Sequence, residues 1–261
     1  MYHLGLLSEY LKNYMKTRLT YRADFWVEVL SDLLFQVTNL IFIFVIFMHT
    51  NSLVGWSQSE VVFVYGFFMV PWGVFACFVN MWNFSERYIV KGEMDRILTR
   101  PAHNLFQIFL ENVDPPSLIG SFIGLFIMAV SGFNMGLPFE WWTIPALIVL
   151  TISASAIYMG IYTTLTALSF YSDAPTGIIP LMYNIQSYGR YPVTMYNRAI
   201  QVLLTWILPF AFVGVYPAGL FLQREEMTRM ALLTPVMGAI FVSIGLFVWN
   251  RGVRKYKGAG S

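Results

Sequence analysis

The chain has 261 residues, of which 57% are hydrophobic and only 11% are charged, and its mean hydropathy is +0.60. A soluble domain is about half apolar and about a quarter charged, so this composition excludes a water-soluble globule. The formal net charge of +2 is too small for the basic surface of a nucleic-acid binder, and we expect no nucleic acid partner. The single cysteine, Cys77, excludes an intrachain disulfide and is expected to pack in an apolar run.

Six apolar runs are long enough to cross a membrane, which takes about 20 residues. They lie near residues 26–48, 61–82, 117–135, 144–170, 202–221 and 231–250. Long runs without strict alternation predict helices rather than barrel strands. The sequence therefore predicts an all-α integral membrane protein with six transmembrane helices, and residues 1–261 form a single domain because no internal repeat divides them.

Basic residues alternate between the two sides of these spans. The first segment, the loop at 83–116, the connection containing Arg190 and Arg198, and the tail together hold 14 of the 16 lysines and arginines. Because basic residues favour the cytoplasmic side, we expect both termini to be cytoplasmic. The fifth span is the least regular, since Tyr216-Pro217 interrupts it, and a helix broken there could dip into the outer leaflet.

Residues 1–23 have the pattern of a helix that lies in the membrane interface. Leu4, Leu7, Leu11 and Tyr14 recur at helical spacing, with polar residues on the other side. The segment lacks the compact apolar core and the cleavage site of a signal peptide. A cytoplasmic helix packed against a partner is the alternative interpretation.

A polar stripe marks the entry of the first span. Asp24, Glu28, Asp32 and Gln36 are spaced by four residues and Asn39 follows three later, so all five share one helix face. Carboxylates there should face protein or water rather than lipid. The stripe indicates either a polar wall of a translocation route or an interfacial stripe paired with nearby basic residues.

Several kinds of chemistry find no support in the sequence. His3, His49 and His103 fall on different sides of the membrane in this topology, so we expect no metal site. No G-x-x-x-x-G-K-[ST] loop occurs, so ATP and Mg would have to be bound by another chain. Small and hydroxyl-bearing residues crowd the fourth span, which indicates close helix packing more strongly than a substrate site.

The loop at 83–116 contains a short amphipathic segment. Gly92 should end one helical stretch and Pro101 should stop the next. Between them, Met94, Ile97 and Leu98 share one side. An exposed apolar face with a charged rim is typical of a docking element, although a loop folded back on the lipid headgroups is equally compatible.

Three segments, in order, resemble one family. Residues 89–101 (IVKGEMDRILTRP) look like a G-x-h-D-x-x-L-x-R-P pattern, h being apolar, residues 207–218 (ILPFAFVGVYPA) look like a proline-bounded fifth span, and residues 249–261 (WNRGVRKYKGAGS) look like a basic, tyrosine-containing tail. Together they resemble the permease subunits of type-2 ABC exporters, in the six-span branch near the daunorubicin-resistance type. The likeness covers nearly the whole chain.

The resemblance implies the type-2 ABC exporter fold: an N-terminal elbow helix over 1–23, a cytoplasmic coupling helix in the loop at 83–116, and an extracellular re-entrant stretch over 216–230. It implies a bacterial plasma-membrane efflux subunit without enzymatic activity, paired with a second permease, identical or a sibling, and with two ATPase subunits that bind ATP and Mg. The residues expected to couple to the ATPase are Gly92, Glu93, Met94, Asp95, Ile97, Leu98, Arg100 and Pro101. Those expected at the translocation path or gate are Asp32, Gln36, Asn39, Pro209, Tyr216 and Pro217.

Two other classes of protein remain as alternatives. An ion-coupled secondary transporter would use Asp32 as a proton or cation site, but it should show inverted repeats and deeper charges. A membrane-embedded enzyme would need a catalytic constellation at membrane depth, and the sequence shows none.

Overall fold

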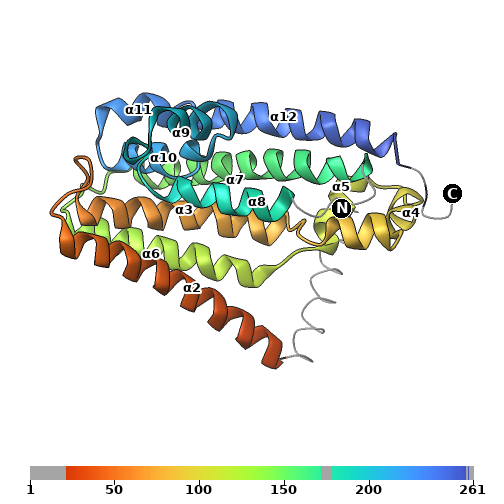
Figure 1. The fold of residues 1–261 in the computed structure, drawn as a ribbon, viewed down its shortest axis with the longest axis horizontal. Coiled ribbons are helices and arrows are strands. Elements are labelled where there is room, and N and C mark those ends of the chain that lie inside the picture. Colours follow the sequence, from red (N-terminus) through yellow and green to blue (C-terminus); the bar gives the residue numbers. More distant parts are fainter. Residues whose placement is uncertain (1–21, 172–177, 257, 259–261) are drawn as a thin grey trace.

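The computed structural model describes residues 22–171, 178–256 and 258, which form helices and no β-sheet (Figure 1). The predicted elbow helix lies outside the described residues, except that Arg22 and Ala23 begin α2 (Arg22–His49). The other long helices are α3 (Gln58–Phe78), α6 (Leu118–Asn134), α7 (Thr143–Ala167) and α12 (Thr234–Val253). They run along the long axis of the molecule (Figure 1). One end of the bundle, which we call the α4 end, carries α4 (Glu93–Leu98) and α5 (Asn104–Glu111), and the opposite end, which we call the α11 end, carries α11 (Glu225–Ala231).

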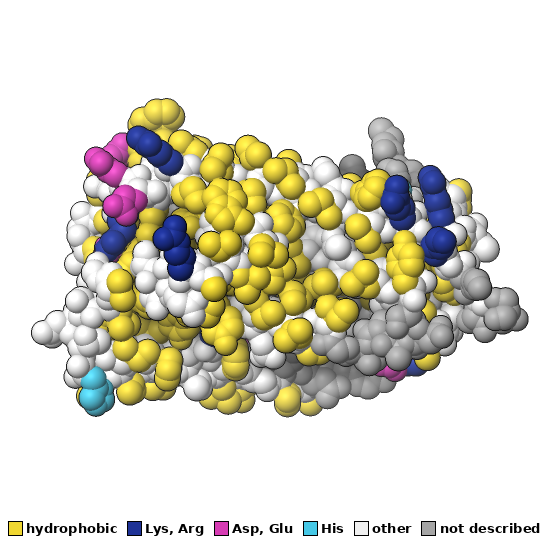
Figure 2. All heavy atoms as spheres, turned by 45° about the horizontal axis from the view of Figure 1, so that its top comes forward, with side chains coloured by type: hydrophobic (Ala, Val, Ile, Leu, Met, Phe, Trp, Pro, Cys, Tyr) yellow, Lys and Arg dark blue, Asp and Glu magenta, His cyan; other side chains and the backbone are white. Residues whose placement is uncertain are grey.

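Five helical stretches in the described part of the chain are long and apolar enough to cross a membrane. They are Phe25–His49, Gln58–Phe78, Pro115–Asn134, Thr143–Phe170 and Glu225–Val253. Figure 2 shows apolar side chains across the middle of one face, with charged side chains confined to its two ends. This distribution matches a hydrocarbon layer between two polar interfaces, so the prediction of an all-α membrane protein is confirmed.

Two helix pairs, α3 with α6 and α7 with α12, form the closest contacts. A Cβ placed on Gly124 of α6 would lie 2.5 Å from the backbone oxygen of Gly66 in α3. A Cβ on Gly160 of α7 would lie 2.2 Å from the backbone of Phe241 in α12. The small residues of the fourth span thus permit direct backbone approach, as the packing interpretation predicted.

The fifth crossing differs from the predicted one. The predicted span at 202–221 consists of two legs, Arg198–Ile207 and Phe210–Phe221, bent by 72°. The crossing that leaves the α4 end begins with α8 (Ile178–Gln186). Tyr183 of α8 packs against Trp82 just beyond α3, with ring centroids 5.9 Å apart, whereas Thr194 accepts a hydrogen bond from Trp56 just before α3. Residues 178–194 therefore run along α3 from end to end.

The two legs enter and leave the bundle at the same end. The first begins with α9 (Arg198–Val202), close behind Thr194, and the second ends with α10 (Val215–Phe221), where Phe221 stacks on Trp142 at the start of α7. Between the legs, Phe210 reaches Tyr158, near the middle of α7, at a ring distance of 6.0 Å. The legs form a re-entrant pair that begins earlier than the predicted stretch at 216–230.

The predicted interruption at Tyr216-Pro217 is wrong, because both residues lie inside α10. Pro217 occupies the first turn of this helix, where a backbone N–H would have no intrahelical partner, so proline is tolerated there. The chain instead breaks at Pro209 between the legs and again at Gln223, whose φ is +56°, before α11 (Glu225–Ala231).

Candidate functional site

The segment between α3 and α6 folds into a compact unit at the α4 end. It contains a π-helical turn (Ser85–Val90), α4 (Glu93–Leu98) and α5 (Asn104–Glu111). Gly92 joins the first two with a φ of +73°, in the left-handed region that glycine adopts without strain. The predicted break at this glycine is confirmed, whereas α5 was not anticipated.

This unit, which we call the end unit, has its own apolar core and is joined to two long helices. Phe84 lies 5.3 Å from the ring of Trp249 in α12, and Phe170, which follows α7, lies 5.2 Å from the same ring. The Trp249 indole donates a hydrogen bond of 2.9 Å to Asn104 at the start of α5. The end unit is therefore packed directly against α12 and the end of α7.

Glu111, at the end of α5, is the electrostatic centre of the end unit. Its side chain is only 5% exposed, yet it accepts two hydrogen bonds from Arg96, at 2.8 and 2.7 Å, and one from Arg100 at 3.1 Å. The hydroxyl of Tyr88 donates to it at 3.1 Å, and Arg87 lies 3.7 Å away. The hydrogen bonds to Glu111 hold the pKa of Arg96 above its usual value, so the network remains charged.

The predicted coupling residues divide into a buried and an exposed set. Met94 and Ile97 are completely buried in the end unit, so the expectation that they form an exposed docking face is wrong. Leu98 is 42% exposed, and Asp95, Arg100 and Pro101 are also exposed. Glu93 pairs with Arg87 at 2.9 Å. The exposed residues Asp95, Leu98, Thr99, Arg100 and Pro101 form what we call the α4 surface.

The predicted path residues of α2 gather along α8. Asp32 and Gln36 line a small pocket of about 60 Å³ together with Trp72 and Tyr183. The hydroxyl of Tyr65 donates a hydrogen bond to Gln36. The side chains of Asp24 and Glu28 lie outside what the structure describes.

Arg190, directly after α8, completes this arrangement, because its Nη1 donates a hydrogen bond to the side-chain oxygen of Asn39. We call Asp32, Gln36, Asn39, Tyr183 and Arg190 the polar seam. The sequence interpretation missed Arg190 because it treated the residue as a loop cation. Its aromatic context, Tyr188-Gly189-Arg190-Tyr191-Pro192, was the available signal.

The polar seam differs from the lipid-like surfaces elsewhere on the bundle. The exposed side chains of α6 and α12 include Phe122, Phe126, Val236 and Ile240, whereas α8 exposes Asn184 beside Leu181. Polar groups at membrane depth face protein or water. We therefore expect the polar seam to face protein or water rather than lipid.

At the α11 end, Arg224 clamps the re-entrant pair to α3. Its guanidinium pairs with Glu60 at 2.8 Å, donates to the carbonyl of Gly55 at 2.8 Å, and stacks 3.9 Å above the buried ring of Trp56. Tyr216 shares a hydrogen bond of 3.0 Å with Thr205 of the other leg.

The three predicted gate residues thus belong to the re-entrant pair. Tyr216 joins its two legs through Thr205, Pro209 lies at the bend between them, and Pro217 is buried in α10.

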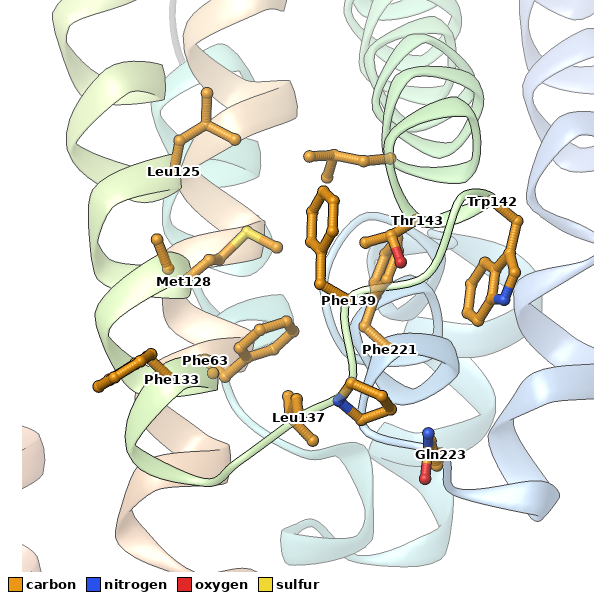
Figure 3. Close-up of a pocket in the computed structure, with 14 residues that line it drawn as sticks. Phe63, Leu125, Met128, Phe133, Leu137, Phe139, Trp142, Thr143, Phe221 and Gln223 are labelled. Atoms are coloured by element: carbon orange, nitrogen blue, oxygen red, sulfur yellow. The ribbon is translucent and has the colours of Figure 1, made fainter.

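An apolar cavity of about 420 Å³ opens between α6 and α7 near the same end. Figure 3 shows Leu125 and Met128 of α6 on one side and Trp142 and Thr143 at the start of α7 on the other. Such a cavity can hold an apolar chain but offers no catalytic group. Within the described residues, no group of three or more His, Cys, Asp or Glu side chains could hold a metal ion.

The membrane-length helices define a multi-pass membrane protein with a compact helical unit at one end of the bundle. A family model described as "ABC-2 family transporter protein" matches residues 33–260, so the chain belongs to the ABC-2 transporter family. It is accordingly the permease type of subunit, a transport component rather than an enzyme. No curated protein and no solved structure matches the chain.

Proposed function

We propose that this chain is half of the translocation pathway of an ATP-driven exporter in the bacterial plasma membrane. A second permease, identical or a sibling, forms the other half, and two ATPase subunits that bind ATP and Mg drive the cycle. The observation that carries the proposal is the structure of α4 within a family member: one side of α4 is locked into the end unit, and the other exposes Leu98.

The α4 surface is the docking site for the ATPase in this proposal. ATP binding favours closed ATPase subunits, and a rigid docked unit passes that bias to helices that have two packed arrangements. Trp249 and Phe170 connect the end unit to α12 and α7, so these two helices receive the displacement first. Gly92, Glu93, Met94 and Ile97 then act as supports that fix the position of α4.

The polar seam faces the second permease in this arrangement and contributes Asp32, Gln36 and Asn39 to the path. The re-entrant pair, with Pro209, Tyr216 and Pro217, closes the outer side. The α4 end is cytoplasmic, and the elbow helix of residues 1–23 lies in the interface beside it. In this arrangement Arg190 and Arg198 no longer lie in a cytoplasmic loop. The end unit and the tail still place basic residues on the cytoplasmic side, in agreement with the positive-inside rule.

The test is purification of the chain from its native membrane in mild detergent, with wild type, Leu98→Asp and Leu232→Asp compared. Leu232 is a matched control because it is an exposed leucine at the α11 end. We expect an ATPase to co-purify with wild type and with Leu232→Asp but not with Leu98→Asp, while all three proteins insert normally. Recovery of the same ATPase with Leu98→Asp would refute docking through the α4 surface, and a chain that never carries an ATPase would refute the permease assignment.

A further inference from the structure

Arg190 is a charged side chain at the middle of the membrane layer. Its guanidinium lies 5.8 Å from the ring centroid of Phe68, which is the eleventh of the 21 residues of α3. Its side chain is 9% exposed. An arginine at this depth is costly and normally marks a functional site with an anionic partner.

The partners of Arg190 in the described part of the chain are all neutral. Nε donates 2.8 Å to the carbonyl of Ser187, and Nη1 donates to the amide oxygen of Asn39. No carboxylate of a described residue lies within 4.0 Å of the Arg190 guanidinium. The Nη2 atom of Arg190 has no hydrogen-bond partner among the described residues, and it is not fully enclosed by protein. Asp32, the acidic residue of the seam, lies seven residues before Asn39, about 10 Å along α2.

Three tyrosines lie in the same part of the bundle as Arg190. Tyr183 and Tyr191 lie within electrostatic reach of Arg190, and so does Tyr158. The Tyr158 hydroxyl is buried and has no hydrogen-bond partner among the described residues. An arginine with tyrosine donors nearby is a typical recognition set for phosphate or carboxylate oxygens.

We propose that Arg190, with its tyrosine neighbours, binds the anionic headgroup of an amphiphilic substrate that travels along the polar seam. The anion supplies the counter-charge that Arg190 lacks among the described residues. The guanidinium lies against Phe68, and the exposed side chains of Leu33 and Phe35 line the seam pocket beside Asp32 and Gln36, so the site has room for an apolar chain next to the headgroup. The substrate role rests on the proposed function, but the binding site does not.

The first experiment compares amphiphiles of equal chain length on the unmodified full-length permease in phosphatidylcholine nanodiscs. Labelled dodecyl phosphate should bind above the level of empty discs, and unlabelled dodecyl phosphate should displace it. Dodecyltrimethylammonium and inorganic phosphate should not. Displacement by the ammonium compound would overturn the charge preference, and equal displacement by inorganic phosphate would overturn the amphiphile assignment.

The second experiment compares Arg190→Gln with Arg198→Gln, a matched control on an exposed arginine eight residues away. Loss of a charge-assisted hydrogen bond should weaken dodecyl phosphate binding about tenfold or more in Arg190→Gln only. Wild-type affinity in Arg190→Gln would overturn the proposal. So would separation of the permease pair in that variant with binding intact, because Arg190 would then pair with a carboxylate of the second permease.

The two proposals fail separately. Binding is measured without an ATPase, so a chain that binds dodecyl phosphate but never carries an ATPase keeps the anion site and loses the exporter assignment. An ATPase-bound permease that ignores dodecyl phosphate loses only the anion site.

Discussion

Replacing Glu111 by glutamine should loosen α4 without unfolding the bundle. Glu111 is nearly buried and is the acceptor shared by Arg96, which lies within α4, and Arg100, which follows α4 by two residues. Glutamine has the same shape but loses the charge and one acceptor oxygen. The end unit would then contain clustered arginines without their central counter-charge.

The magnitude follows from the geometry. A hydrogen bond to a charged group contributes about 1.5–3 kcal/mol, and Arg96 makes two such bonds to Glu111. The side chains of Arg87, Arg96 and Arg100 are 36–42% exposed, so hydrogen bonds to water replace much of the interaction energy that they lose with Glu111. We therefore expect a net cost of about 2 kcal/mol, which corresponds to about a 30-fold larger local opening equilibrium.

Hydrogen exchange of the amides of residues 93–98 measures this opening directly. Exchange should accelerate about 30-fold in Glu111→Gln, while α3 and α7 keep their protection. Glu86→Gln is the matched control, because Glu86 pairs at 2.7 Å with the exposed Lys91 and should leave α4 unchanged. Unchanged exchange in Glu111→Gln, or equal acceleration throughout the bundle, would refute the view of Glu111 as the local anchor of α4.

Three further predictions concern packing and the α11 end. Gly160→Ala should lower the thermal stability of the detergent-solubilised protein because its Cβ would overlap the α12 backbone, whereas Gly120→Ala, which meets nothing within 4 Å, should not; equal melting temperatures would contradict the close contact. Arg224→Gln and Glu60→Gln should each destabilise the re-entrant pair by about 1 kcal/mol, and a double-mutant cycle should show coupling; strict additivity would mean that the ion pair contributes nothing. Met94→Asp should reduce the yield of folded protein, since it would bury a charge in the end unit; a stable, fully expressed variant would disprove that burial.

Hydropathy predicted five of the crossings because each is a helix that is long and apolar enough to span the hydrocarbon layer. It misplaced the crossing between α7 and α9 because α8 carries Asn184 and Gln186 and is followed by Arg190, and these polar residues lower the mean hydropathy of the segment. The apolar stretch at 202–221 looked like a span, yet Pro209 and Gly214 let it fold back on itself. A window average cannot distinguish residues buried by protein from residues facing lipid.

The site was predicted in outline but not in its contacts. The Gly92 break and the position of α4 follow from local chain geometry, so the sequence was sufficient for both. Which face of α4 is exposed depends on Phe84 and Trp249, which are distant in sequence and pack together only in three dimensions. The same reason explains why Glu111, 15 residues from Arg96, was not recognised as its partner.

The uneven packing of the helices determines which parts can move. The contact of Gly160 with the α12 backbone makes α7 and α12 a rigid pair that joins the end unit to the α11 end, because close-packed backbones have little room to slide. In contrast, α2 is largely exposed and is held to the rest by core contacts of Ile43 and by hydrogen bonds of Gln36 and Asn39. A push on α4 should therefore shift α7 and α12 together relative to α2. That shift would open or close the polar seam, because Asn39 lies on α2 and its partner Arg190 lies on the other side of the seam, directly after α8.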